Sequence, residues 1–139
     1  MNEHFVDSNL LVYANSKKRE GSRKQKISQL LLENLTPTIS IQVLNEFSNV
    51  VTNPRKLNFT RKIAVGLASN FSQSLETIPV DLSTHELAML WYLSEQLTLW
   101  DSLIVTSAKL ADCTTLYSED MHHGQTFGNV TITNPLRDE

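Results

Sequence analysis

The sequence contains little cysteine, and this scarcity excludes several kinds of structure. Cys113 is the only cysteine in 139 residues, so the chain can form neither an internal disulfide nor a thiolate metal cluster. It follows the apolar residues Leu110 and Ala111. We therefore expect Cys113 to pack as a small buried side chain rather than to act as a nucleophile.

Long hydrophobic runs are also absent. No apolar segment approaches the roughly 18 residues that a membrane-spanning helix requires, and the opening residues MNEHFVDSN lack the pattern of a secretory signal. We therefore expect a cytoplasmic protein without a membrane segment. The length of 139 residues and the hydrophobic content of 40% fit one globular domain over residues 1–139.

Acidic residues are scarce in the first part of the chain and basic residues in the second. Residues 1–62 hold ten Lys/Arg against five Asp/Glu, whereas residues 63–139 hold two against ten. This segregation is compatible with a basic surface that meets a polyanion beside an acidic site that holds cations. It is also compatible with ordinary solvated helices, which are the commoner case.

Short strand-like segments alternate with amphipathic helical segments. The strand candidates are residues 4–6, 38–40, 76–80, 115–117 and 130–132. Because no hairpin signal was identified between neighbouring strands, the alternation predicts an α/β fold. We expect a three-layer sandwich in which a short-stranded parallel sheet is flanked by helices. Ligands in such folds bind beyond the carboxyl ends of the strands.

The helical segments follow from apolar residues at helical spacing. They are residues 10–14, 27–35, 41–51, 61–71, a helix opened by the capping-box pattern Ser83-x-x-Glu86, and residues 100–112. In the last of these, Ser102 and Thr106 are predicted to face solvent. Residues 119–129 are predicted to form a polar loop.

Four acidic residues stand at strand ends and helix edges. Asp7 follows the first strand directly, and Asp120 comes just after the strand that ends at Tyr117. Glu46 lies at the rim of the apolar face of its helix, and Asp101 projects toward the buried side of its own. Taken singly, each acid could instead cap a helix, close a turn or remain solvated. Together they address one edge of the predicted sheet.

A cluster of carboxylates requires protons or cations. Two carboxylates about 4 Å apart repel each other by roughly 4 kcal/mol at an effective dielectric constant near 20. Hard oxygen ligands, without Cys or a required His, select Mg²⁺ or Mn²⁺ over zinc. Such an ion can recruit a phosphodiester and lower the pKa of a bound water.

Four segments carry a resemblance to a known family: FVDSNLLVYA, ISIQVLNEF, LWDSLIVTSAKLADCTTLYSEDMHHG and ITNP. Over nearly its whole length the chain resembles a PIN domain of the VapC toxin type. The resemblance implies a metal-dependent endoribonuclease that cuts RNA by water attack and leaves 5′-phosphate and 3′-hydroxyl ends.

The resemblance also implies roles for individual residues. Asp7, Glu46, Asp101 and Asp120 would hold Mg²⁺ or Mn²⁺. Asn9 and Ser118 would orient Asp7 and Asp120 by hydrogen bonds, with an ordinary helix cap and a turn serine as the alternatives. His122 and His123 follow the last acid; one could lean toward the metal or a phosphate, although loop histidines more often lie on the surface.

The implied partners are RNA, a second copy of the chain in a homodimer, and a cognate antitoxin lying across the active-site groove. Apolar residues in the segment 43–71 could form such contacts, and core burial explains them equally well. Basic residues could attract RNA, contact the antitoxin or merely solvate helices. They are Lys17, Lys18, Arg19, Arg23, Lys24, Arg55, Lys56, Arg61 and Lys62.

Two other functions compete with this interpretation. A phosphatase of the haloacid dehalogenase type also places an Asp after its first strand, but it needs a second Asp two residues later, where this chain has Asn9. A PIN-like module that binds RNA or protein without catalysis is the other alternative. The complete set of four acids argues against a decayed site.

Overall fold

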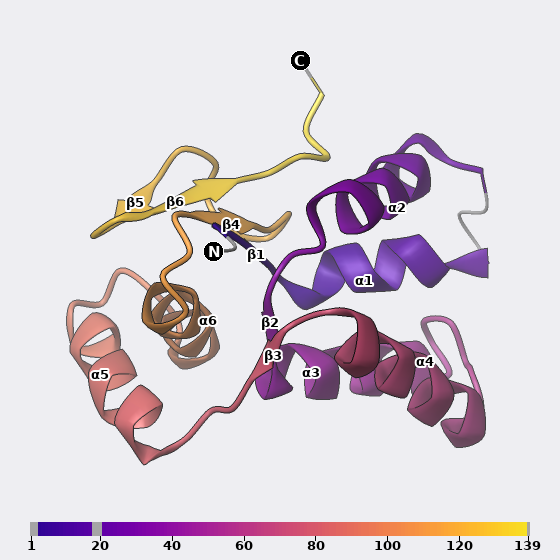
Figure 1. Cartoon of the computed structure of the whole chain (residues 1–139), viewed down its shortest axis with the longest axis horizontal. Helices are drawn as coiled ribbons and strands as arrows, with labels where there is room; N and C mark the ends of the chain where they lie inside the picture. Colours follow the sequence, from indigo (N-terminus) through magenta and orange to yellow (C-terminus); the bar gives the residue numbers. More distant parts are fainter. Residues whose placement is uncertain (1–2, 18–20, 139) are drawn as a thin grey trace.

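The computed structural model describes residues 3–17 and 21–138. The strands are β1 (His4–Val6), β2 (Ile39–Ser40), β3 (Thr77–Ile78), β4 (Thr115–Tyr117), β5 (Thr126–Phe127) and β6 (Val130–Thr133). The helices, seen in Figure 1, are α1 (Ser8–Asn15), α2 (Arg23–Leu35), α3 (Ile41–Thr52), α4 (Arg61–Ser74), α5 (Leu82–Leu93) and α6 (Leu99–Leu110).

The main sheet has four strands in the order β1-β4-β6-β5. The strands β1, β4 and β6 are parallel, with Phe5 opposite Leu116 and Leu116 opposite Ile132. Parallel neighbours need crossover connections; helices lie in the connection from β1 to β4, whereas the connection from β4 to β6 is a loop that contains β5. A second, two-stranded parallel sheet joins β2 to β3. The predicted α/β fold, a mostly parallel sheet flanked by helices, is confirmed.

One prediction is wrong at the edge strand β5. Residues 119–129 were expected to form a loop, but Thr126–Phe127 pairs antiparallel with Val130–Thr131. Gly128 occupies the turn with φ 61°, a conformation that glycine adopts at little cost. The dipeptide Gly128-Asn129 is a hairpin signal, but a strand of two residues before it is too short to show an apolar–polar alternation in the sequence.

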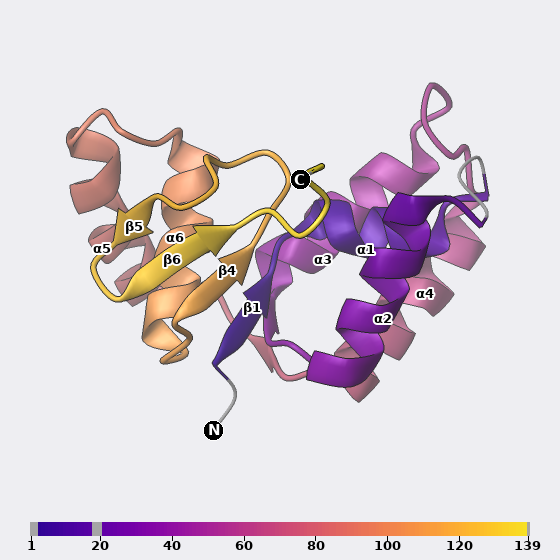
Figure 2. The ribbon, with the colours of Figure 1, turned by 90° about the horizontal axis from the view of Figure 1, so that it is seen from above.

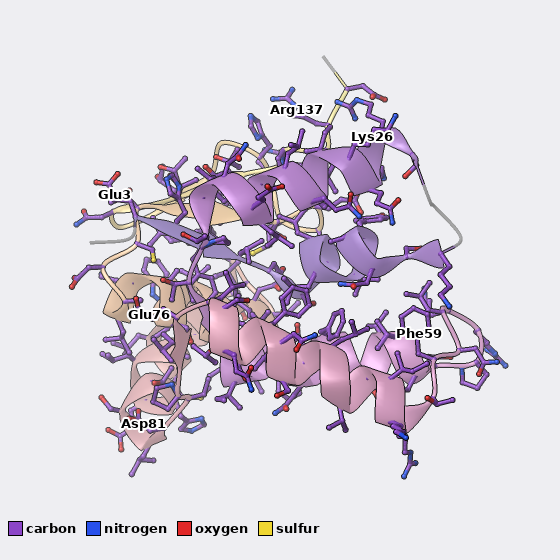
Figure 3. The ribbon with its side chains drawn as sticks, turned by 45° about the vertical axis from the view of Figure 1, so that its right-hand side comes forward. Glu3, Lys26, Phe59, Glu76, Asp81 and Arg137 are labelled. Carbon is purple, nitrogen blue, oxygen red and sulfur yellow. The ribbon has the colours of Figure 1, made fainter. Side chains whose placement is uncertain are left out.

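The helices form two groups around the sheet. Helix α6 contacts β4 and β6, and α5 packs along α6; both lie on one side of the sheet in Figure 2. Helix α1 continues from β1 and contacts α2 and α3, while α4 packs on α3. Figure 3 shows Lys26 on α2 and Phe59 on the α3–α4 connector, on opposite sides of α1.

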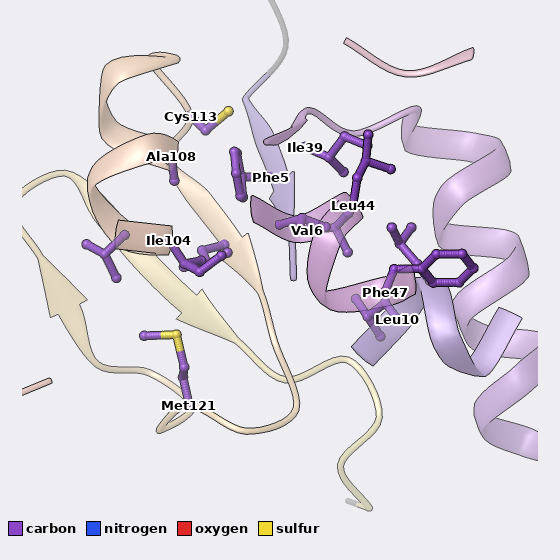
Figure 4. Packing of buried hydrophobic residues seen from close by; sticks show 14 of the residues in the cluster. Phe5, Val6, Leu10, Ile39, Leu44, Phe47, Ile104, Ala108, Cys113 and Met121 are labelled. Atoms are coloured by element: carbon purple, nitrogen blue, oxygen red, sulfur yellow. The ribbon is translucent and has the colours of Figure 1, made fainter. Parts of the chain in front are cut away.

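A continuous apolar core joins the two groups. Phe5, Ile39 and Phe47 are fully buried, and Ile104 from α6 is 1% exposed; Figure 4 shows these side chains between the sheet and the helices. Cys113 is buried in the same cluster, as predicted. Burial raises the pKa of its thiol to about 11, so the thiol carries no nucleophilic thiolate at neutral pH.

Two local predictions about α5 and α6 are wrong. The cap of α5 is Asp81, whose Oδ1 accepts a hydrogen bond from Thr84 N at 3.0 Å, so the predicted box beginning at Ser83 lies inside the helix. Ser102 and Thr106 were expected to face solvent, but they are 0% and 2% exposed because α5 packs along α6. In the described part of the chain, no helix is long and apolar enough to cross a bilayer.

Candidate active site

Asp7 occupies the junction between β1 and α1. It caps α1: its Oδ1 accepts from Ser8 N at 2.7 Å, and its Oδ2 accepts from Ser118 Oγ at 2.9 Å. The residue is only 6% exposed. Burial raises the pKa of its carboxyl to about 6; the two hydrogen bonds oppose this rise, and the negative charges of Glu46 and Asp101 add to it.

Glu46 extends from the middle of α3 toward the same edge. Its Oε2 accepts a hydrogen bond from Ser8 Oγ at 3.2 Å, and its Oε1 accepts from Gln42 Nε2 at 3.0 Å. Ser8 therefore links Glu46 to Asp7, since its backbone N–H binds one carboxylate and its hydroxyl the other.

Asp101 lies in the first turn of α6, where a negative charge is favourable to the helix dipole. Its backbone N–H donates to the capping oxygen Thr98 Oγ1 at 3.1 Å. Burial raises the pKa of its carboxyl, a hydrogen bond with Thr98 lowers it, and the charge of Asp120 raises it further. Asp101 is thus within electrostatic reach of both Asp7 and Asp120.

Asp120 is held by hydrogen bonds to Asn9 and Ser118. Its Oδ2 accepts from Asn9 Nδ2 at 3.2 Å, and its backbone N–H donates to Ser118 Oγ at 3.3 Å. The Ser118 hydroxyl therefore donates to Asp7 and accepts from Asp120. Asn9 and Ser118 thus contact the acids beside which the resemblance places them.

The four acids lie at one edge of the sheet, but their side chains do not converge closely enough to bind one ion together without moving. Among residues 3–17 and 21–138, no group of three or more His, Cys, Asp and Glu is placed so that it could hold a metal ion directly. The ion pairs recorded in this part of the chain use Glu119 and Asp138 instead. The negative charges of Glu46 and Asp101 raise the pKa of Asp7, and that of Asp120 raises the pKa of Asp101; carboxylate oxygens of this kind are the donors that a hard divalent cation prefers.

Glu119 is turned away from this cluster. It accepts a hydrogen bond from Tyr13 Oη at 2.6 Å and pairs with Lys24 Nζ at 2.5 Å, and Lys24 lies 5.2 Å from the centre of the Tyr13 ring. This contact fixes the loop that carries Asp120 to α1 and α2. Sequence reasoning missed the role of Tyr13 because no local pattern links residues so distant in the chain.

The predicted basic residues differ in how they are engaged. Lys24 is committed to Glu119, and Arg23 binds the carbonyl oxygens of Leu136 and Arg137 at 2.9 and 3.0 Å. Lys18 and Arg19 lie outside the described residues.

Arg55 and Lys56 line a groove of about 420 Å³ that reaches Ser8, Asn9 and Asp120. The groove connects positive charge with the acidic edge. His122 and His123 are both exposed, and His123 Nδ1 accepts a hydrogen bond from Asn134 N at 3.0 Å.

The solved structures similar to this one include a toxin and two complexes with DNA fragments. VapC20 from Mycobacterium tuberculosis, a toxin that cleaves the sarcin-ricin loop, is 16% identical, with a TM-score of 0.67 over 84% of this chain and 89% of that one. VapBC2 from Rickettsia felis, bound to a DNA fragment from its promoter, is 23% identical, with a TM-score of 0.65 over 94% and 97%. FitAB bound to the IR36 DNA fragment is 16% identical, with a TM-score of 0.64 over 98% and 97%.

At these identities, the structural likeness shows the fold. No curated protein matches the sequence. The model of the PIN domain family matches residues 4–126, a range that begins at β1 and contains Asp7, Glu46, Asp101 and Asp120. This match spans most of the chain and agrees with the observed fold, so the chain belongs to the PIN domain family.

Proposed function

We propose that this protein is a divalent-metal-dependent endoribonuclease and the toxin of a toxin–antitoxin pair. The observation that carries the proposal is the gathering of Asp7, Glu46, Asp101 and Asp120 at one edge of the sheet, where Ser8 and Ser118 bridge neighbouring acids and the negative charges of the cluster raise the pKa values of Asp7 and Asp101. Membership of the PIN family and the fold shared with VapC20 support the same activity.

The four carboxylates would hold Mg²⁺ or Mn²⁺, which when bound supplies an activated water and neutralises charge on the phosphate. Ser8 and Ser118 fix the two oxygens of Asp7, and Asn9 fixes Asp120. Water attacks the phosphorus and its proton passes to a carboxylate, while the bond to the 3′-oxygen breaks and that oxygen takes up a proton from the protonated carboxylate or from solvent. The products are a 5′-phosphate and a 3′-hydroxyl, and no protein nucleophile is needed.

RNA would approach along the groove that joins Arg55 and Lys56 to the acidic edge. An acidic site repels a polyanion, so positive side chains beside it are needed to attract the backbone. Each contact between a cation and a phosphate releases counterions, and RNA binding is therefore expected to weaken as salt increases.

A homodimer and a cognate antitoxin belong to the same proposal, which places one nuclease domain over residues 1–139 in the cytoplasm. The complexes VapBC2 and FitAB support a protein partner. In the segment 43–71, Val43 and Phe47 are core residues, whereas Ile63 and Val65 on α4 are 47% and 68% exposed, so core burial explains only part of its apolar content. Exposed apolar side chains gather on α5, where Leu82 is 70% and Leu93 is 78% exposed, and such a surface favours protein contacts.

The decisive experiment incubates the purified protein with total RNA in Mg²⁺, in Mn²⁺ and in EDTA. Asp101→Asn is the test variant, and Asp112→Asn, which alters an exposed acid beyond the other end of α6, is the matched control. We expect metal-dependent cleavage by the parent and the control but not by Asp101→Asn.

RNA that stays intact with every protein but is retained in a binding assay would support the non-catalytic module instead. A covalent phosphate on Asp7 would support the phosphatase. Sequencing of the cleaved ends would identify the target.

A further inference from the structure

A second pocket adjoins the acids at Glu46, whereas the basic groove adjoins them at Asp120. It has a volume of about 580 Å³ and is lined by Ile41, Gln42, Asn45, Glu46, Asn49, Val80, Trp100 and Leu103. Glu46 lines this pocket and binds Ser8, which lines the groove of Arg55 and Lys56. A chain that follows the basic groove across the acids therefore arrives at this second pocket.

The pocket presents an aromatic surface and a row of amides. Trp100 is 62% exposed, which is unfavourable for so large an apolar side chain unless a ligand covers it. Three amides, Gln42, Asn45 and Asn49, share one face of α3 because they recur at intervals of three and four residues. Flat rings and amides are the groups with which proteins stack and hydrogen-bond unpaired bases.

Gln42 connects the pocket to the acids. Its Nε2 donates to Glu46 Oε1 at 3.0 Å and to the carbonyl oxygen of Trp100 at 3.1 Å. These two bonds fix the orientation of the amide. Its Oε1 is buried and, among the described residues, has no hydrogen-bond partner. The side chain therefore links the backbone of Trp100 to Glu46, so its role is to position these two residues.

The charge of the pocket excludes a phosphate as its main occupant. None of its described lining residues is Lys, Arg or His, and Glu46 is its one charged side chain. The basic groove, which contains Arg55 and Lys56, suits the backbone. The occupant of the second pocket should be flat, uncharged and edged with hydrogen-bonding groups.

We propose that this pocket is a nucleobase subsite in which Trp100 stacks on an unpaired base of the RNA and the amides of Asn45 and Asn49 on α3 contact its edge. The inference rests on the proposed ribonuclease function and narrows it, because a stacked and hydrogen-bonded base must be unpaired. The RNA substrate is therefore single-stranded or looped at the nucleotide whose base enters the pocket. Trp100 is then a positioning and specificity residue beside the reacting phosphate.

The test measures binding in an Asp101→Asn background with Mg²⁺, so that RNA stays intact. The probe is a fluorescein-labelled single-stranded RNA of about twelve nucleotides, within the range bound by known single-strand sites. We expect Trp100→Ala to weaken binding by about 5- to 100-fold and Trp100→Phe to restore most of the loss. Tyr92→Ala, which removes an aromatic side chain 50% exposed on α5, is the matched control and should leave binding unchanged.

Two further measurements separate base stacking from a structural effect. Inorganic polyphosphate of similar length carries charge without bases, and Trp100→Ala should bind it as tightly as the parent. With Trp91→Phe added to the non-cleaving background, Trp100 is the only tryptophan, and RNA should quench its fluorescence whereas polyphosphate should not.

If Trp100→Ala binds RNA as tightly as the Asp101→Asn protein that carries no second substitution, the proposal is overturned. The occupant of the pocket would then be a side chain of a partner protein. That result is independent of the ribonuclease assay, whose failure appears as intact RNA with the unaltered protein in Mg²⁺.

Discussion

Replacing Asp7 by Asn should stabilise the metal-free protein while abolishing its activity. Burial raises the pKa of the carboxyl from 3.8 to about 6, so ionised Asp7 is unfavourable in the folded state. The amide preserves the shape, and its oxygen can still accept from Ser8 N while its NH₂ group donates to the Ser118 hydroxyl. It removes the charge that Glu46 and Asp101 oppose.

The magnitude follows from linkage between protonation and folding. A carboxyl whose pKa is raised on folding contributes stability that is fully present below about pH 3.8 and lost as the pH rises through 6. Because one pKa unit corresponds to about 1.4 kcal/mol, the loss is about 1.5 kcal/mol near pH 5 and about 3 kcal/mol near pH 7.5. The advantage of Asp7→Asn over the parent should grow by the same amounts.

Urea denaturation in EDTA, repeated at several pH values, measures this difference. Glu33→Gln alters an exposed carboxylate on α2 and serves as the control, with the pH dependence of the parent. Mg²⁺ should raise the free energy of unfolding of the parent more than that of Asp7→Asn, because only the parent has the complete set of ligands. The assignment of a buried charge to Asp7 would be refuted if Asp7→Asn were less stable than the parent near pH 7.5. It would also be refuted if the difference in free energy of unfolding between the two proteins were the same at all pH values.

Three further substitutions test separate parts of the structure. Ser118→Ala removes a hydrogen bond that lowers the pKa of Asp7; the acid limb of the pH–rate profile should move to higher pH, and metal affinity should fall by about 10- to 100-fold. Arg55→Ala should decrease the slope of log binding constant against log salt by about 1, measured by RNA titration, because one phosphate contact is lost. Phe47→Ala should lower the free energy of unfolding by about 3–5 kcal/mol in urea denaturation, because Phe47 is fully buried against Phe71.

For each of these three substitutions, one outcome would contradict the structural argument behind the prediction. An unshifted pH–rate profile for Ser118→Ala would show that its hydroxyl does not control Asp7 during catalysis. An unchanged salt slope for Arg55→Ala would remove the basic groove from the path of the RNA. A loss well under 1 kcal/mol for Phe47→Ala would place Phe47 outside the packed core.

The sequence determined the elements of the fold because their signals are local. Apolar residues at helical spacing, short strand-like runs and capping residues act within one or two turns of chain, and they located β1, α3, α6 and β4 within a few residues. The order of Asp7, Glu46, Asp101 and Asp120, with their flanking segments, was also sufficient to indicate the PIN family. The positions of Asp7 and Asp120 beyond strand ends followed from the predicted strands.

Tertiary packing decided what no local pattern contains. Ser118 donates to Asp7, and Asn9 to Asp120, across 111 residues of chain in both cases. Ser102 is buried because α5 covers a face of α6 that its own periodicity assigned to solvent. The charge state of an acid and the exposure of a side chain depend on distance and on excluded water, and those quantities are set only when distant segments pack together.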